Sequence, residues 1–209
     1  MAPSNTNSVL LVSGSDCVIF DAWGFVDDWQ ELLSDRGLNL HAIYSTHGHG
    51  DHVSAAPELA GRLGIDWYLS HHDFDLFNAT TADGLSAGNA LLKYFEMPEI
   101  PDNCKQPIDL HAGEIEVVPG QIATIIETPG HSSGGISFYF PAEKVLIIGD
   151  TIFQDCIGRY DLPGADLGDL RKSISKIYNM NLPDDTMVIH GHGIDTTIGW
   201  LRKNNPYFK

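Results

Sequence analysis

The 209 residues suffice for one medium-sized domain, and shares of 43% hydrophobic and 19% charged residues exclude an intrinsically disordered chain. A formal net charge of −16, from 12 basic and 28 acidic residues, argues against nucleic acid or an anionic membrane as a partner. No apolar run approaches the roughly 20 residues that a membrane-spanning helix needs.

The start of the chain and its cysteines predict where the protein works. Residues Met1 to Asn5 lack the basic and apolar regions of a signal peptide. Cys17, Cys104 and Cys156 are far apart and form no CxxC pair, which is typical of a reducing compartment. We therefore expect a cytoplasmic protein without a disulfide framework or a thiolate metal site.

The first half of the chain alternates short apolar runs with two amphipathic stretches. Helical spacing of apolar residues predicts helices over Asp28–Gly37 and Val53–Leu63. Pro57 fits the second helix only if it falls in the first turn. Because it carries three prolines, Gly84–Ile108 is an expected loop or lid. Strands are predicted at Val9–Val12, Cys17–Asp21, Leu40–Ser45 and Trp67–Ser70.

The second half of the chain shows the same kind of alternation. Helices are predicted over Leu167–Tyr178 and, near the end of the chain, over Thr196–Asn204. Grouped strands with interspersed helices predict an α/β protein in which sheets pack face to face with helices outside, as one domain over residues 1–209. The predicted strands are Ile115–Val118, Ala123–Glu127, Gly135–Phe140, Lys144–Ile148 and Met187–His190.

Four potential metal ligands fall within six positions after the predicted strand Leu40–Ser45. They are His47, His49, Asp51 and His52, and imidazole and carboxylate are usual ligands of zinc and other first-row metals. The intervening glycines allow tight turns, so His47 and His49 could bind one ion while Asp51 and His52 turn toward a second. A histidine-rich loop arising by chance explains this density poorly.

Three more candidate ligands follow predicted strands elsewhere in the chain. His131 comes after Ala123–Glu127, Asp150 after Lys144–Ile148, and His192 after Met187–His190. Each alone is more typical of a turn residue than of a ligand. Because binding residues concentrate in loops that a scaffold positions, the three together with the first cluster favour a shared metal centre.

These motifs together resemble the metallo-β-lactamase superfamily and, within it, the glyoxalase II-like small hydrolases. The resemblance covers nearly the whole chain, including an opening strand pair that ends in Asp21. It implies an α/β fold with four layers, an αβ/βα sandwich, with the metals at one edge. The matching segments are His47–His52, Thr128–His131, Gly149–Thr151 and Gly191–Gly193.

The resemblance also implies a ligand set and a mechanism. Two divalent ions, zinc by default with iron or manganese as alternatives, would lower the pKa of a bound water to about 7. The metal-bound hydroxide would attack a carbonyl carbon, and Asp51 would be the catalytic residue that both binds metal and orients the hydroxide. The implied ligands are His47, His49 and His131 for the first metal, Asp51, His52 and His192 for the second, and Asp150 as the bridge.

Two residues are candidates for contact with a small-molecule substrate. Ile157–Gly164 resembles a Gly-Arg-Thr-Asp-Leu-Pro-Gly run of small glyoxalase II-like bacterial proteins, with Tyr160 in place of threonine. Arg159 in this run could hold a substrate carboxylate or brace the loop by pairing with Asp161. Trp23, in the loop after the second predicted strand, is a candidate for the pocket wall.

Glyoxalase II proper continues into a helical domain that helps to bind glutathione, whereas this chain ends at Lys209, soon after its last motif. We therefore expect a metal-dependent thioester or ester hydrolase without that C-terminal domain. The alternatives are a persulfide dioxygenase with a single iron, and a lactonase or β-lactamase of the same fold. Cys156 is an alternative nucleophile, and His190 is either a partner of the metal site or a buried strand-end residue.

Overall fold

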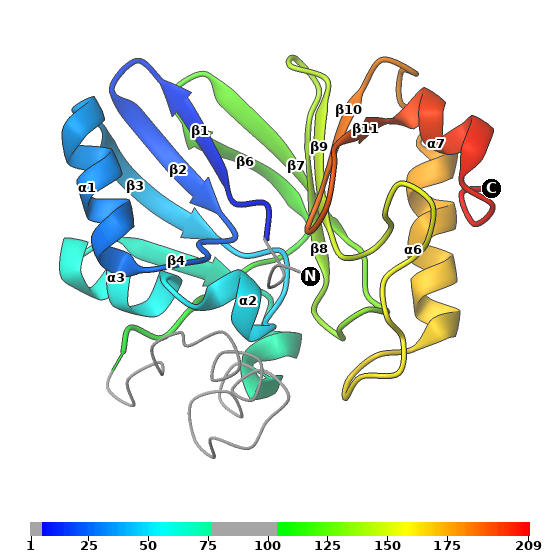
Figure 1. The fold of residues 1–209 in the computed structure, drawn as a ribbon, viewed down its shortest axis with the longest axis horizontal. Coiled ribbons are helices and arrows are strands. Elements are labelled where there is room, and N and C mark those ends of the chain that lie inside the picture. The colour runs from blue at the N-terminus through cyan, green and yellow to red at the C-terminus, as the bar shows by residue number, and fades with distance from the viewer. Residues whose placement is uncertain (1–5, 77–103) are drawn as a thin grey trace.

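Two mixed β-sheets form the frame of the protein in the computed structural model, which describes residues 6–76 and 104–209 (Figure 1). The first sheet contains, in spatial order, β1 (Val9–Ser13), β2 (Asp16–Phe20), β3 (Asn39–Tyr44), β4 (Asp66–Leu69) and β5 (Ile108–Asp109). The second contains β11 (Thr196–Thr197), β10 (Met187–His190), β9 (Val145–Gly149), β8 (Ile136–Phe140), β7 (Gln121–Glu127) and β6 (Gly113–Val118).

Strand direction determines which loops share an edge. Strands β2 to β5 are parallel, and only β1 pairs antiparallel in the first sheet. In the second sheet β7 and β9 both pair antiparallel with β8, and β10 is parallel to β9. Strands β7, β9 and β10 therefore run in one direction, and their carboxyl ends lie at one edge of the sheet.

Helices cover the outer faces of both sheets, which confirms the predicted four-layer αβ/βα sandwich (Figure 1). Between the sheets, Phe20 of β2 packs edge to face against Phe138 of β8, with ring centroids 4.9 Å apart. The helices are α1 (Val26–Arg36), α2 (Gly50–Val53) and α3 (Ala56–Leu63) on the side of the first sheet, and α6 (Leu167–Asn179) and α7 (Ile198–Asn204) on the side of the second.

The predicted helix over Val53–Leu63 is wrong in one respect, because the structure divides this stretch into α2 and α3. Pro57 lies in the first turn of α3, where its missing N–H costs no intrahelical hydrogen bond. The chain between the two helices is tied to the loop after β2, since the Ala55 N–H donates to the Ala22 carbonyl at 3.0 Å.

The predicted closing helix over Thr196–Asn204 also starts later than expected. Its first two residues form β11, and the Thr197 hydroxyl caps α7 by accepting from the Trp200 N–H at 3.1 Å. Most of the predicted loop Gly84–Ile108 lies outside the described residues, although Ile108 itself begins β5. A single domain over residues 1–209 stays a prediction. In the described ranges, no helix has the length and apolar character to cross a membrane.

Candidate metal centre

The structure brings together the seven side chains that the sequence predicts as metal ligands. They lie where β3, β7, β9 and β10 end, and α2 begins inside the first motif. Because these strands deliver their loops to one edge, residues up to 141 positions apart in the chain become neighbours. We call this the seven-residue cluster: His47, His49, Asp51, His52, His131, Asp150 and His192.

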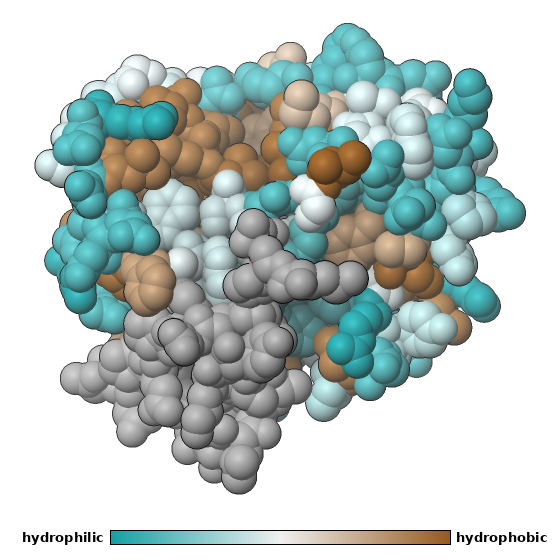
Figure 2. Space-filling view, viewed as in Figure 1, coloured by the Kyte–Doolittle hydropathy of each residue, from teal (hydrophilic) through white to brown (hydrophobic). Residues whose placement is uncertain are grey.

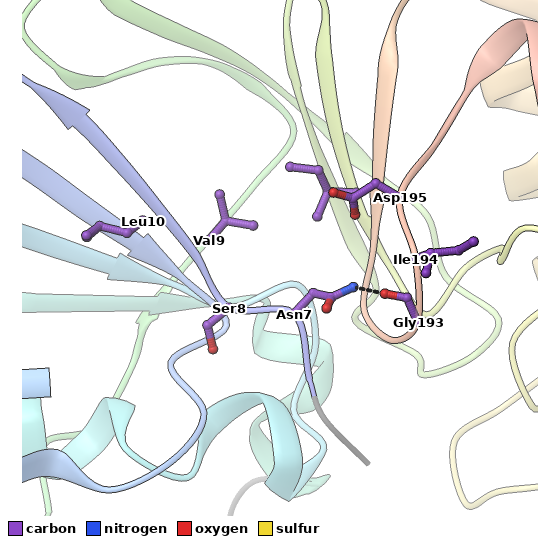
Figure 3. Close-up of a pocket in the computed structure, with 8 residues that line it drawn as sticks. Asn7, Ser8, Val9, Leu10, Gly193, Ile194 and Asp195 are labelled. Carbon is purple, nitrogen blue, oxygen red and sulfur yellow. Dashed lines mark hydrogen bonds between the residues drawn. The ribbon is translucent and has the colours of Figure 1, made fainter. Parts of the chain in front are cut away.

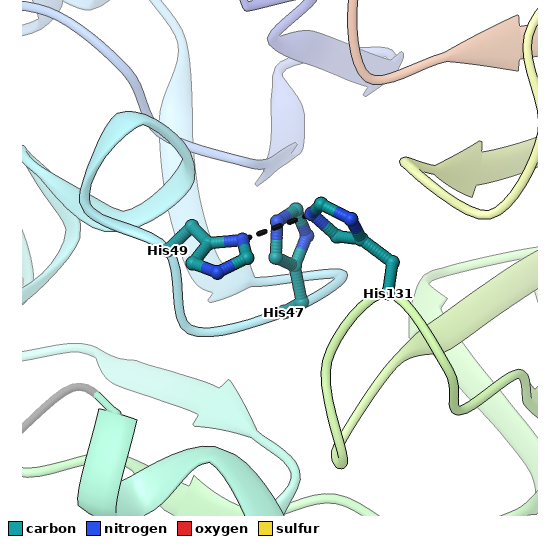
Figure 4. Close-up of side chains that lie close together, drawn as sticks. All are labelled: His47, His49 and His131. Atoms are coloured by element: carbon teal, nitrogen blue, oxygen red, sulfur yellow. Dashed lines mark hydrogen bonds between the residues drawn. The ribbon is translucent and has the colours of Figure 1, made fainter. Parts of the chain in front are cut away.

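Three histidines form the first half of the cluster. The possible ligand atoms of His47, His49 and His131 all lie within 4.8 Å of one another. His131 Nε2 stands 2.9 Å from His49 Nδ1, and Figure 4 shows the three rings turned toward a common point. The ring of His47 is nearly perpendicular to each of the other two rings, which suits three nitrogens around one ion.

The second half combines one carboxylate with two histidines. His192 Nε2 lies 3.3 Å from Asp51 Oδ2 and 3.4 Å from His52 Nε2. Asp51 and His52 are neighbours on α2, whereas His192 arrives from the loop after β10. The donor set of one oxygen and two nitrogens is one that divalent first-row metals accept.

Asp150 lies between the two halves. Its Oδ2 is 3.4 Å from His131 Nε2 and 3.5 Å from His192 Nε2, and its Oδ1 is 3.5 Å from His52 Nε2. One carboxylate therefore reaches a histidine of the first half and two of the second. This is the position that a bridging ligand needs.

Two buried atoms of the cluster have no hydrogen-bond partner among the described residues: His47 Nε2 and Asp150 Oδ1. Thr46 Oγ1 donates its only proton to Asp21, so it accepts from His47 Nδ1 at 3.0 Å, and the lone pair of Nε2 is left free. Buried polar atoms are seldom left unpaired. An imidazole lone pair and a carboxylate oxygen aimed into one cluster fit a divalent cation.

Asp21 is a functional candidate that the sequence analysis missed, although it noted this residue as the end of a strand. The Asp21 carboxylate accepts from His52 Nδ1 at 2.9 Å and from the Thr46 N–H at 2.7 Å. It is buried, and its backbone adopts a positive φ of 53° directly after β2. A carboxylate behind a ligand histidine fixes the ring orientation and leaves Nε2 free to bind metal.

Asp73, at the end of the short 3-10 helix η1 (His71–Asp73), was also missed. Its fully buried carboxylate accepts from the Gly48 N–H at 2.9 Å, the Gly134 N–H at 2.6 Å and the Ser132 hydroxyl at 2.7 Å. One side chain thus ties the loop of the first motif to the loop that carries His131. Only its place after a strand distinguished Asp73 in the sequence.

Asn7 holds the last motif in place. Its N–H donates to the Gly191 carbonyl at 2.8 Å, and its side-chain amide donates to the His190 carbonyl at 3.0 Å. The same amide donates to the Gly193 carbonyl at 2.9 Å (Figure 3). The same segment borders a cavity of about 530 Å³ between β1 and β10, on a face where Figure 2 shows apolar surface over β1. None of the seven-residue cluster lines this cavity.

Gly191 permits the close approach of the last motif to the centre. A Cβ atom at this position would stand 2.0 Å from Asp150 Oδ1 and 2.8 Å from His52 Cε1. Both contacts are far inside van der Waals range, so the backbone of the β10 loop packs directly on the cluster. A glycine is therefore required beside His192 for steric reasons.

The charges of the cluster are strongly coupled. Burial, reinforced by the neighbouring His131, lowers the pKa of His49 to about 3. Burial also lowers the pKa of His52, but the carboxylates of Asp21 and Asp150 outweigh it and raise the pKa to about 10. Burial raises the pKa of Asp51, yet the hydrogen bond from His192 and the surrounding imidazoles hold it well below its usual range.

The predicted substrate residues have other contacts in this structure. Arg159 pairs with Asp161 through two hydrogen bonds of 3.0 Å, which is the bracing alternative, and its carbonyl accepts from His131 Nδ1 at 2.8 Å. Trp23 packs against the core between the first sheet and its helices, and its carbonyl accepts from the Trp29 indole at 2.8 Å. These contacts leave the predicted substrate roles of Arg159 and Trp23 untested.

His190 and Cys156 lie near the cluster but not in it. His190 is buried, and its Nδ1 donates to the Ile152 carbonyl at 2.6 Å, which supports the loop that follows Asp150. Cys156 is an exposed free thiol. Partial burial, together with the nearby Asp155, raises the pKa of Cys156, which opposes formation of a nucleophilic thiolate.

A four-layer sandwich with clustered histidine and aspartate side chains at one edge defines a class of metal-dependent hydrolases. The family model described as "Metallo-beta-lactamase superfamily" matches residues 1–192, and the chain belongs to that family. It is 34% identical over 194 residues to "Hydroxyacylglutathione hydrolase GloC" of Haemophilus influenzae, covering 92% of this chain and 87% of that protein.

Two crystal structures are also similar. That of BLEG-1 B3 metallo-beta-lactamase has a TM-score of 0.84 at 31% identity, covering 100% of this chain and 97% of that one. The crystal structure of TTHA1623 in a di-iron-bound form has a TM-score of 0.81 at 30% identity, and the match covers 99% of this chain and 97% of that one.

Proposed function

We propose that this chain hydrolyses a small thioester or ester, in the manner of glyoxalase II, with two divalent ions held by the seven-residue cluster. His47, His49 and His131 would hold one ion, and Asp51, His52 and His192 the other. The observation that carries the proposal is the position of Asp150, whose carboxylate lies within 3.5 Å of histidine nitrogens from both halves.

The carboxylates in and beside the cluster have different roles in the proposed reaction. When bound, the two ions supply a hydroxide nucleophile at neutral pH and a Lewis acid for the substrate carbonyl. Asp150 contributes the negative charge that offsets repulsion between the cations. Asp51 accepts from His192 in this structure, and with a substrate present its carboxylate can orient the attacking water. Asp21 holds the ring of His52 in place.

Thioester chemistry is favoured by the hydroxyacylglutathione hydrolase relative at 34% identity. A β-lactamase is the second candidate, because a structure described as a B3 metallo-beta-lactamase covers the whole chain at 31% identity. A persulfide dioxygenase needs one iron only, and the close grouping of Asp51, His52 and His192 argues for a second ion.

Three assays on one metal-reconstituted preparation separate these candidates. We expect thiol release from S-lactoylglutathione or a simpler thioester, and little β-lactam opening or oxygen consumption with a persulfide. Oxygen consumption as the dominant activity would overturn the proposal in favour of the dioxygenase. Dominant β-lactam opening would overturn it in favour of the second candidate.

Variants connect the activity to the cluster. His49→Ala and Asp51→Ala should each abolish hydrolysis and lower the metal content, because each removes a ligand from a different half of the centre. His41→Ala is the matched control, since His41 is exposed and pairs with Asp16 at 2.8 Å, away from the cluster. Unchanged turnover in either cluster variant would refute the assigned site.

We propose zinc as the resident metal, with iron or manganese as alternatives that suit the same donors. Elemental analysis of protein purified without a histidine tag decides among them. We also propose a cytoplasmic location and a small-molecule substrate. Within residues 6–76 and 104–209 the cysteines form no disulfide, which agrees with a reducing compartment.

A further inference from the structure

A second group of potential ligands lies outside the seven-residue cluster, where η1 meets β5. It consists of His71 in η1, Asp109 at the end of β5, and His111 two residues later. One ligand atom from each lies within 4.8 Å of the other two, and all three side chains are partly or largely exposed. The proposed hydrolytic function uses none of them.

The two imidazoles converge on one carboxylate. His71 Nδ1 lies 3.1 Å from both oxygens of Asp109, and His111 Nε2 lies 3.1 Å from Oδ2. Metal bonds of about 2.1 Å at tetrahedral or octahedral angles separate neighbouring ligand atoms by about 3.0–3.4 Å. The two nitrogen–oxygen spacings therefore match those of neighbouring ligands around a small divalent ion, and the two nitrogens lie within 4.8 Å of each other.

The carboxylate is held ready for this role. The backbone N–H of His71 donates to Asp109 Oδ1 at 2.8 Å, which fixes the carboxylate relative to η1. Desolvation raises the pKa of Asp109, but the hydrogen bonds from His71 outweigh it and lower the pKa, so the group is ionised at neutral pH. The chain carries a net charge of −16, which raises the local concentration of cations around it.

We propose that His71, Asp109 and His111 form a peripheral binding site for a divalent first-row cation, zinc in the first instance, with water completing the coordination. The site is distinct from the hydrolytic centre and does not depend on the proposed reaction. Because the donors are exposed, we expect the ion to exchange readily with solvent. Two imidazole nitrogens and one carboxylate oxygen are a donor set that divalent first-row cations accept.

Binding there would join two segments 38 positions apart, namely η1 and β5. An ion that binds only the folded arrangement of these two segments stabilises the folded state by mass action. It would also stiffen η1, whose last residue, Asp73, holds both the Gly48 and the Gly134 backbone. Cation binding at the periphery should therefore raise the thermal stability of the whole protein.

The experiment counts zinc on the intact protein with its hydrolytic centre saturated. After equilibrium dialysis against micromolar free zinc, we expect His71→Ala and His111→Ala each to retain one zinc ion fewer per chain than the wild type. His41→Ala, which breaks an exposed histidine–aspartate pair without a third donor, should bind as much as the wild type. Equal zinc content in all four proteins would overturn the proposal and leave simple imidazole–carboxylate hydrogen bonds.

A thermal measurement checks the same site independently. Added zinc should raise the melting temperature of the saturated wild type and of His41→Ala, but not that of His111→Ala. Thioester hydrolysis by His111→Ala should stay at the wild-type level. The zinc content and the melting temperature do not depend on hydrolysis, so they test this site even if the hydrolase proposal fails. An equal rise in His111→Ala would contradict the site.

Discussion

Asp21 and His52 lie 31 positions apart in the chain and meet through a hydrogen bond of 2.9 Å between the carboxylate Oδ2 and the imidazole Nδ1. Both side chains are almost fully buried. The contact exists because β2 and β3 are parallel neighbours, so that the loops leaving them lie together. It leaves His52 Nε2 directed at Asp150 and His192.

This contact predicts that Asp21→Asn weakens metal binding without removing a ligand. An amide carries no charge, and its NH₂ group competes as a donor, so the ring of His52 loses its orientation. We expect the affinity for one ion to fall by about 10- to 100-fold. Competition with a chelator measures this affinity, and Asp16→Asn, which changes the partly exposed carboxylate paired with His41, is the control. A wild-type affinity in Asp21→Asn would show that the contact is dispensable.

Asp73→Ala should lower the stability of the fold as well as the activity. The substitution leaves the buried N–H groups of Gly48 and Gly134 without their acceptor. Each buried group left unpaired costs about 1–3 kcal/mol, so we expect the two to cost about 2–6 kcal/mol. Urea denaturation of metal-free protein measures it. Ser132→Ala, which removes one of the donors, should cost less, and an equal loss in both variants would contradict the account.

Gly191→Ala should damage the centre through steric conflict alone. The new methyl group would lie 2.0 Å from Asp150 Oδ1, so the bridging carboxylate or the β10 loop must move. We expect at least a 100-fold loss of turnover, since displacements of about 1 Å can cost that much. Gly61→Ala is the control, because its Cβ meets nothing closer than 3.9 Å and a helix interior favours alanine. Normal turnover in Gly191→Ala would contradict the packing.

The pKa values predict that metal uptake by the metal-free protein releases protons. His52 has a pKa of about 10, so it is protonated at pH 7 and must lose its proton before Nε2 can bind a cation. His49, with a pKa of about 3, is already neutral and releases none. Metal affinity should therefore rise as the pH is raised from 6 to 9. Calorimetry in buffers of different ionisation enthalpy counts the protons, and His52→Ala should release about one fewer. Equal release by both proteins would contradict this assignment.

Local pattern in the sequence predicted most of the elements and the family. Alternating apolar runs predicted every strand longer than two residues, and the density of ligand residues in His47–His52 identified the centre. The two shortest strands, β5 and β11, were missed because two residues are too few for any periodicity. The division between α2 and α3 was missed although Pro57 had indicated where a helix must begin.

The supporting residues could not be predicted in the same way. Asp21, Asp73 and Asn7 lie outside the motifs that contain the predicted ligands, so spacing alone did not connect them with the metal centre. Their roles depend on partners between 25 and 186 positions away, which only the parallel arrangement of the strands brings into contact.

The sequence by itself determined the class of chemistry, because imidazole and carboxylate groups at short spacing have few uses other than binding cations. The tertiary structure decided which histidines each Asp150 oxygen approaches, how His52 is oriented, and that Arg159 pairs with Asp161. The spacing of residues along the chain restricts the relative placement only of side chains that are close in the sequence. The directions of distant side chains are set by how the two sheets pack and by which buried groups must find hydrogen-bond partners.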